Sequence, residues 1–472
     1  MSETIIPIEV HRDLPSIDVL RRIEGPGPRY TSYPTADRFT DGFDATRLDA
    51  VLAQERQSVQ AEAGAALSIY VHIPFCESLC YYCACNKIIT KHHERAAPYL
   101  DALEAEIGLV AGRFGERRTL SQLHFGGGSP TFLSDDEIAR LMGTLRRAFE
   151  FAPDAEVSIE VDPRTVTPLR MSFLRSQSFN RVSFGVQDFD AQVQQAVHRV
   201  QSFESVRDLI RVARDLGFGS INADLIYGLP RQTAESFTRT IAQMIELRPD
   251  RIALYAYAHL PQRFKPQRRI ASEDLPVAGD RVAMLGIAMD GFIECGYEYI
   301  GMDHFALPED PLAVAKREGR LQRNFQGYST QPDCDIVGLG VSAIGRIRDC
   351  YYQNAKTLPE YYEALEQQRL PVVRGIDLDH DDLTRRDIIM ALMCHGRVEF
   401  ADISRRHGVS MREAFAPELV RLAPFVADGF VHLEEDTIQV TPIGWYVVRA
   451  VAMVFDRYLQ GGASRERFSK VV

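Results

Sequence analysis

Six apolar runs recur along the chain, and their spacing limits the fold more than any other feature. They read "LSIYVHIPF", "LSQLHFGGG", "EVSIEVDP", "RVSFGVQD", "INADLIYGLP" and "RIALYAYAHLP". The runs lie roughly 30 residues apart with helix-patterned segments between them, such as 96–114, as parallel βαβ units require. We therefore predict an α/β fold built on a parallel, TIM-like barrel, either complete or partial. Such barrels place their active sites at the carboxyl ends of the strands, where each of these runs meets polar or glycine residues.

The barrel does not account for the whole chain. We expect an N-terminal arm at 1–60, a barrel with a substrate-site extension at 61–375, and a small, mainly helical C-terminal domain at 376–472. From about residue 378 the sequence is dense in amphipathic helix signals, followed by "IQVTPIGWYVV", which is strand-like with a turn at Pro442. A winged-helix-like domain that covers the barrel mouth and excludes water is our hypothesis.

Charge and composition exclude several classes of function. The net charge of −11 argues against a broad nucleic-acid footprint, which needs a clustered excess of Lys and Arg. Apolar stretches such as "VVRAVAMVF" fall short of the roughly 20 residues that span a bilayer. The start of the chain lacks the apolar run of a secretory signal. We therefore predict a cytoplasmic protein with no membrane or nucleic-acid partner.

One short loop, "FCESLCYYCACNK", carries four of the eight cysteines. Cys76, Cys80 and Cys83 follow a Cys-x₃-Cys-x₂-Cys pattern directly after the first predicted strand. A disulfide pair, a structural zinc site, an iron–sulfur cluster and chance all compete. The zinc alternative is weaker because no second cysteine or histidine pair is evident, whereas a single tight loop can supply an iron–sulfur cluster. Three thiolates on a [4Fe–4S] cluster would leave one iron with an open position, which implies chemistry.

The loop resembles the signature of the radical S-adenosylmethionine (SAM) enzymes. With "GPRYTSYPTADRF", "LHFGGGSPTFL", "SIEVDPRT", "FGVQDF", "DLIYGLP", "GMDHFA" and "RNFQGYSTQ", the chain resembles the oxygen-independent coproporphyrinogen III oxidase family from about residue 25 to the C-terminus. The resemblance implies oxidative decarboxylation of two propionates of coproporphyrinogen III to the vinyl groups of protoporphyrinogen IX. A haem-binding or haem-delivery protein of the same superfamily remains the alternative. Cys85 with "CNK" and the "PRYTSYPT" arm favour the oxidase.

The resemblance also implies a set of site residues. Cys76, Cys80 and Cys83 would hold a [4Fe–4S] cluster whose fourth iron takes the amino and carboxylate groups of SAM. A first SAM would contact Tyr70, Gly127, Glu160 and Ile344, and a second SAM would contact Tyr82, Gly128, Ser129, Gln187, Arg199, Asp224 and Ala258. Cys85 would be important for activity without ligating the cluster, or would be a spectator thiol.

The residues alone allow plainer interpretations of several of these positions. The "GGGSP" segment could mark only a tight turn, although it would also allow close approach of the backbone to a ligand. Glu160 could be a salt-bridged acid at the end of a strand. Arg199, in the helix-like "QQAVHRVQ", could be a solvated surface charge.

The implied substrate is a tetrapyrrole with four carboxylates, so its pocket needs cations despite the acidic chain. Arg29, His304, and Arg323 with Gln326 are the candidates for binding the carboxylates. Phe325 could stack on a pyrrole ring. We also expect an electron donor for the cluster and a monomeric enzyme.

Overall fold

Six parallel strands form the centre of the fold. The computed structural model describes residues 25–59, 66–115 and 118–459. The strands pair side by side in chain order and all run parallel. They are β1 (Leu67–Ile73), β4 (Thr119–Gly127), β5 (Glu150–Val161), β6 (Arg181–Gln187), β7 (Ser220–Tyr227) and β8 (Arg251–Ala256). All six strands predicted from the apolar runs are confirmed.

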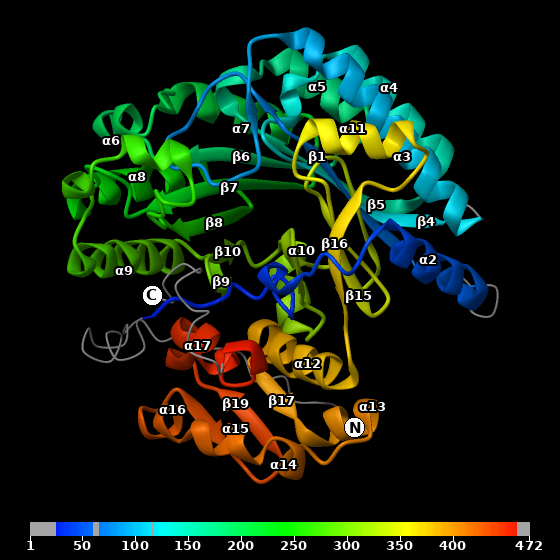
Figure 1. The fold of residues 1–472 in the computed structure, drawn as a ribbon. Coiled ribbons are helices and arrows are strands. Elements are labelled where there is room, and N and C mark those ends of the chain that lie inside the picture. Colours follow the sequence, from blue (N-terminus) through cyan, green and yellow to red (C-terminus); the bar gives the residue numbers. More distant parts are fainter. Residues whose placement is uncertain (1–24, 60–65, 116–117, 460–472) are drawn as a thin grey trace.

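Helices connect these strands and cover their outer face (Figure 1). They are α3 (Ala96–Phe114), α4 (Asp135–Ala148), α5 (Pro168–Ser176), α6 (Ala191–Ala196), α7 (Phe203–Asp215), α8 (Ala234–Leu247) and α9 (Ala278–Glu294). Their ends follow from local sequence. At α4, for example, Ser134 and Glu137 form a capping box, three acids occupy the first turn, and Arg146 and Arg147 occupy the last.

Further strands extend the sheet at both ends, so the barrel is partial. In the described residues the sheet has twelve strands, with β9 at one edge and β16 at the other. β8 is followed by antiparallel β10 (His304–Ala306) and β9 (Glu298–Gly301). On the far side, β13 (Ile336–Leu339) pairs parallel to β1 and leads antiparallel into β14 (Ile344–Ile347), β15 (Cys350–Asn354) and β16 (Val372–Asp377).

Shorter elements complete this region of the chain. The remaining helices and strands before residue 378 are α2 (Ala45–Val59), β2 (Phe75–Cys76), β3 (Ile88–Ile89), α10 (Pro311–Arg317), β11 (Gln322–Asn324), β12 (Gly327–Ser329) and α11 (Leu358–Glu366). The short 3₁₀ helices of this region are η1 (Ala36–Arg38), η2 (His93–Arg95), η3 (Pro130–Phe132), η4 (Pro163–Thr165), η5 (Lys265–Arg269) and η6 (Ser272–Asp274). Two more, η7 (Ile443–Val447) and η8 (Arg457–Leu459), lie in the C-terminal region.

Alternation along the strands separates the core from the interior of the barrel. On β6, Val182, Phe184 and Val186 are buried, whereas Arg181 and Ser183, which alternate with them, are half-buried and line an inner pocket. Successive strand side chains point to opposite faces, so the apolar set packs under the helices and the polar set faces inward. The same pattern therefore builds the hydrophobic core and a polar cavity.

The C-terminal region is mainly helical, as predicted, and lies below the sheet in Figure 1. Its elements are α12 (His380–His395), β17 (Arg397–Glu399), α13 (Phe400–His407), α14 (Met411–Ala414), α15 (Ala416–Arg421), α16 (Ala423–Ala427), β18 (Val431–Leu433), β19 (Thr437–Val440) and α17 (Val448–Met453). The three strands form a small antiparallel sheet in the order β17-β19-β18.

The predicted strand character of "IQVTPIGWYVV" is only partly right. β19 ends at Val440, and η7 and α17 follow it. The Thr441 hydroxyl accepts a hydrogen bond from the Gly444 N–H, which starts a helical turn that buries Trp445 and Val447. Local capping therefore ends the strand at Val440, two residues before Pro442.

The described part of the N-terminal arm, from residue 25, runs between the sheet and the C-terminal domain (Figure 1). Tyr30 and Tyr33 are fully buried, and the Tyr30 hydroxyl donates to Asp456 at 3.0 Å. Arg449 of α17 donates to the Pro28 carbonyl at 2.7 Å. The arm is therefore part of the packed interior. Residues 1–24, the first part of the predicted arm, lie outside the described residues.

Among the described residues, no helix combines the length and the apolarity needed to cross a bilayer.

A buried carboxylate fixes α3 to the sheet beside β1. Glu106 is 1% exposed and accepts hydrogen bonds from the Gly340 N–H (2.7 Å), the Asn354 amide (2.6 Å) and the Tyr361 hydroxyl (2.6 Å). On the same helix, the Tyr99 hydroxyl donates to the His72 carbonyl of β1 at 2.6 Å. α3 therefore holds both β1 and the turn that leads into β14.

Replacing Glu106 should destabilise the fold strongly. Glu106→Ala removes the acceptor of three buried hydrogen bonds, so we expect a loss of about 3 kcal/mol in the free energy of unfolding. Glu104→Ala, on the exposed side of the same helix, removes an ion pair with Arg140 and should cost under about 1 kcal/mol. Denaturant titrations of both variants test this, and equal losses would contradict it.

Candidate active site

The cysteine loop lies at the carboxyl end of β1, where a parallel barrel places its chemistry. β2 and β3 pair parallel, Phe75 with Ile88 and Cys76 with Ile89, and so fasten the two ends of the loop together. Cys80 is buried, Cys76 and Cys83 are half-buried, and Cys85 is exposed. Because its ends are pinned, the loop presents its thiols at a fixed place above the barrel.

Two guanidinium groups reach the Cys80 sulfur. Arg199 Nη1 lies 3.4 Å and Arg164 Nη2 lies 3.5 Å from Cys80 Sγ. Arg199 is 6% exposed and follows α6, which ends at Ala196, so the interpretation of this residue as a solvated helix charge is wrong. Asp162 accepts from both arginines, at 2.7 Å from Arg164 and 3.3 Å from Arg199. The loop thus sits in a positively charged setting that suits thiolate ligands.

The thiols of Cys76, Cys83 and Cys85 differ in the direction of their pKa shifts. Burial raises the pKa of the Cys76 thiol to about 12. A hydrogen bond between the side chains of Cys83 and Cys85 lowers the pKa of Cys83, and the same contact raises the pKa of Cys85. The Lys87 ammonium donates to the Cys83 carbonyl at 3.0 Å. Metal binding to Cys76 therefore requires release of a proton.

The three glycines at the end of β4, Gly126 to Gly128, allow the chain to pack against itself. A Cβ on Gly128 would lie 2.7 Å from the Pro74 carbonyl oxygen, and a Cβ on Gly127 would lie 2.6 Å from the His72 ring. Gly127 also has a φ of +112°, which side chains disfavour. The close approach expected from "GGGSP" is therefore to the segment between β1 and the cysteine loop. Ser129, 8% exposed, donates its N–H to the Phe75 carbonyl at 2.8 Å.

Glu160, the next-to-last residue of β5, lies beside this glycine segment. Its carboxylate accepts from the Gly127 N–H at 3.2 Å and lies 3.4 Å from His124 Nε2. The His124 ring stacks on Tyr70 of β1 with ring centroids 5.8 Å apart. The structure thus brings Tyr70, Gly127 and Glu160 together through His124, a residue that the sequence analysis missed.

Asp224 lies deeper in the barrel, on β7. Asn222 Nδ2 donates to it at 2.8 Å, and the Ser183 hydroxyl lies 3.4 Å away. Burial, with a smaller contribution from Glu160, raises the pKa of Asp224 to about 7. Its carboxyl group therefore changes charge near neutral pH.

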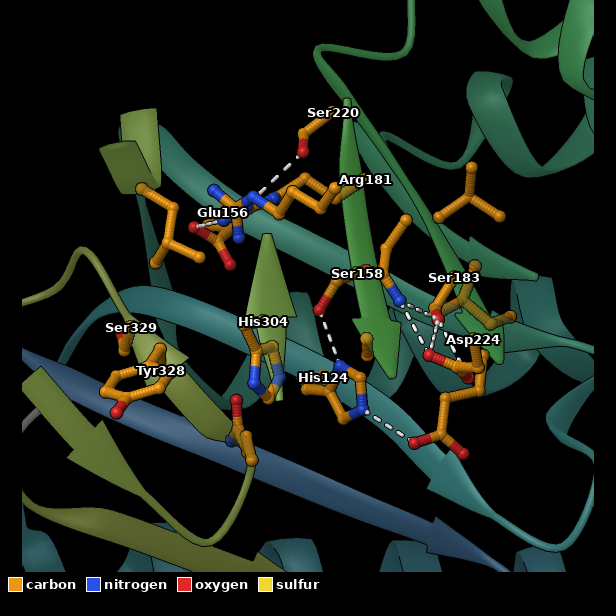
Figure 2. A pocket seen from close by; sticks show the side chains of 18 of the residues that line it. His124, Glu156, Ser158, Arg181, Ser183, Ser220, Asp224, His304, Tyr328 and Ser329 are labelled. Atoms are coloured by element: carbon orange, nitrogen blue, oxygen red, sulfur yellow. Dashed lines mark hydrogen bonds and ion pairs between the residues drawn. The ribbon is translucent and has the colours of Figure 1, made fainter. Parts of the chain in front are cut away.

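Figure 2 shows the pocket that these inward-facing side chains line. Glu160 and Asp224 lie on the parallel strands, and His304, Gln326 and Tyr328 come from the β10–β12 region. At the other end of the pocket, Arg181 pairs with Glu156 and Arg251 pairs with Asp310. The pocket is long, polar and bounded by charged groups.

Five other predicted residues are not among those that line this pocket, namely Tyr82, Ala258, Gln187, Ile344 and Phe325. Gln267, which is 2% exposed, donates to the carbonyls of Tyr82 (2.9 Å) and Ala258 (3.1 Å) and so joins them. Gln187 has a φ of +72°, a strained conformation at the end of β6. Ile344 and Phe325 instead pack in an apolar cluster with Phe39 of the arm.

The candidate substrate cations gather around His304, at one wall of the pocket. Arg29 pairs with Asp303 and lies over the Tyr255 ring at 5.2 Å. Within the described residues, Arg323 Nη1 and His304 Nδ1 are buried atoms without a hydrogen-bond partner. Burial, followed by the charges of Arg323 and Arg29, lowers the pKa of His304 to about 3. This wall is electropositive and has buried polar atoms to offer a ligand.

Comparison with known proteins agrees with this geometry. A radical SAM superfamily model matches residues 70–244, and a HemN C-terminal domain model matches residues 378–447. An oxygen-independent coproporphyrinogen III oxidase from Pseudomonas aeruginosa is 48% identical over 96% of this chain and 98% of its own length, and one from Escherichia coli is 48% identical over 94% and 96%.

A solved structure is also similar to this chain over nearly its full length. The coproporphyrinogen III oxidase (HemN) of Escherichia coli, described as a radical SAM enzyme, superposes with a TM-score of 0.89 at 46% identity, covering 95% of this chain and 99% of that one. The chain belongs to the oxygen-independent coproporphyrinogen III oxidases of the radical SAM superfamily.

Proposed function

We infer that this chain carries out the reaction of its family, the oxidative decarboxylation of coproporphyrinogen III to protoporphyrinogen IX. It is a SAM-dependent oxidoreductase of porphyrin biosynthesis. The observation that carries this conclusion is the pinned three-cysteine loop above a polar pocket, in a chain similar to these oxidases over nearly its full length. The haem-delivery alternative is not favoured, because the relatives aligned over the whole chain are named as oxidases.

We propose that Cys76, Cys80 and Cys83 are the cluster ligands. When bound, the cluster and SAM supply a 5′-deoxyadenosyl radical that removes a hydrogen from a propionate side chain. The residues present fit an anionic iron–thiolate group, since two guanidinium groups converge on Cys80 and β2–β3 pairing holds the loop closed. Cys85 is exposed beside Cys83, and we propose that it contributes to activity without ligating the cluster.

Two SAM sites are proposed from the placement of the remaining residues. The first SAM would contact Tyr70, Gly127, Glu160 and Ile344. The second SAM would contact Tyr82, Gly128, Ser129, Gln187, Arg199, Asp224 and Ala258. Support comes from Glu160 and Asp224, two acids that line the pocket and are able to accept from amino or hydroxyl groups.

The substrate carboxylates are proposed to meet Arg29, Arg323 and His304. Burial and the neighbouring Arg323 lower the pKa of Arg29, as expected where cations gather without enough anions. A carboxylate would supply the acceptor that the buried Arg323 Nη1 and His304 Nδ1 lack in the described residues. Gln326 lines the same pocket, and Phe325 adjoins it in sequence. We also propose a monomer that takes electrons from a separate donor.

Loss of any one of the three loop cysteines should abolish the reaction. Full-length protein reconstituted anaerobically with iron and sulfide, then given SAM, a reductant and coproporphyrinogen III, should form protoporphyrinogen IX. Single Ala replacements of Cys76, Cys80 and Cys83 should lower iron content and reduce product by at least about 100-fold. Cys334→Ala, at a half-buried cysteine outside the loop, is the matched control. Product formation by the three variants at the rate of this control would refute the ligand assignment.

Asp224 should give SAM binding a pH dependence. Its raised pKa of about 7 means that the carboxylate form, which can accept from an amino group, grows about tenfold between pH 6 and pH 8. Equilibrium dialysis should therefore show the weaker of two SAM sites tightening by up to about tenfold over this range. Asp224→Asn should flatten the profile, and Glu156→Gln, paired with Arg181 in the same pocket, should keep it. A steep profile in Asp224→Asn would contradict this role.

A further inference from the structure

Arg164 is a half-buried cation that contacts Cys80 and belongs to neither the proposed SAM sites nor the proposed substrate site. It lies in η4, directly after β5, and its guanidinium points back to the cysteine loop, with Nη2 3.5 Å from Cys80 Sγ. We propose that Arg164 is a positioning residue that raises the reduction potential of the cluster through this N–H···S contact. The inference rests on the proposed ligation of the cluster by Cys80.

The turn that carries Arg164 also holds its side chain. Asp162 caps η4 by accepting the Arg164 backbone N–H at 3.1 Å. The same carboxylate binds the Arg164 guanidinium at two points, Nε at 2.9 Å and Nη2 at 2.7 Å. A planar guanidinium group that is hydrogen-bonded at two nitrogens has little rotational freedom. The Nη2 donor that faces Cys80 is therefore preorganised.

The charge balance around Cys80 is positive. Arg164 and Arg199 both approach the sulfur, and both bind the single carboxylate of Asp162. The side chains of Arg164 and Arg199 are 19% and 8% exposed, so solvent screens their charges only weakly. Two other cations contact the loop elsewhere: Lys87 donates to the carbonyl oxygens of Cys83 and Cys85, and Arg269 donates to the Tyr81 hydroxyl. The two arginines therefore act mainly on Cys80.

This arrangement favours the reduced state of the cluster. Reduction adds one electron, taken from a one-electron donor, and increases the negative charge on the cluster and its thiolates. Hydrogen bonds to the sulfurs and nearby positive charge stabilise the more negative state more than the oxidised one, which raises the potential. Variants of Arg199 cannot test this proposal alone, because Arg199 is also proposed to contact SAM. Variants of Arg164 change the contact to the Cys80 sulfur without removing a proposed SAM contact.

The test measures the midpoint potential of the reconstituted full-length protein without SAM, by redox titration followed by electron paramagnetic resonance. Arg164→Gln should lower the equilibrium constant for one-electron reduction about tenfold, which corresponds to about 59 mV. Arg164→Lys keeps the charge but loses the fork, and its potential should lie between those of Arg164→Gln and the wild type. Iron and sulfide contents should match the wild type in all variants.

Arg170 provides a matched control six residues along the chain. Its side chain is 18% exposed and is paired with Asp135, much as Arg164 is 19% exposed and paired with Asp162. Arg170→Gln should leave the potential unchanged. A fully loaded Arg164→Gln protein with the wild-type potential, or an equal shift in Arg170→Gln, would overturn the proposal.

Two further outcomes are also decisive. If Arg164→Gln does not retain iron, the midpoint potentials of Arg164→Lys and Arg170→Lys are compared in its place. A wild-type potential in Arg164→Lys then overturns the proposal. Failure of the wild-type chain to assemble any cluster would instead refute the proposed function. The two failures are therefore distinguishable.

Discussion

The structure depends on the burial of one face of its parallel strands. Each of β1 and β4–β8 packs its apolar side chains under helices, and period-two alternation then turns the intervening side chains inward. On β5, burial of Val157, Ile159 and Val161 directs Glu156, Ser158 and Glu160 into the pocket. The hydrophobic core thus determines where the polar side chains lie. A one-residue slip of a strand would turn its apolar side chains into the pocket and its polar side chains into the core.

Charge compensation is the second requirement. An iron–thiolate group is anionic, and bringing it into a partly buried loop is costly without nearby cations. The fold supplies them from two places: the turn after β5, which carries Arg164, and the segment after α6, which carries Arg199. Arg29 and Arg323, beside His304 of the pocket, form a second electropositive region. A chain with a net charge of −11 therefore concentrates positive charge where anions are expected to bind.

Sequence patterns predicted the parts of the fold that have a long, regular period. The six central strands and α3 were placed correctly because each is a continuous apolar or helical pattern. The antiparallel extension was missed, since strands such as β9, β10 and β14 have only three or four residues and no period to detect. Beyond Val440, capping by Thr441 overrode the strand character of the sequence.

For the site, the sequence by itself determined the cysteine loop and the order of the strands that frame it. The spacing of Cys76, Cys80 and Cys83 is local information, as is the alternation that places Glu160 and Asp224 at inward positions. Only the tertiary structure decided that Arg164 and Arg199, 84 and 119 residues from Cys80, share its sulfur, and that Gln267 joins Tyr82 to Ala258. The reason is physical: such contacts form when strands pair and helices pack, and no local period encodes which distant side chains then meet.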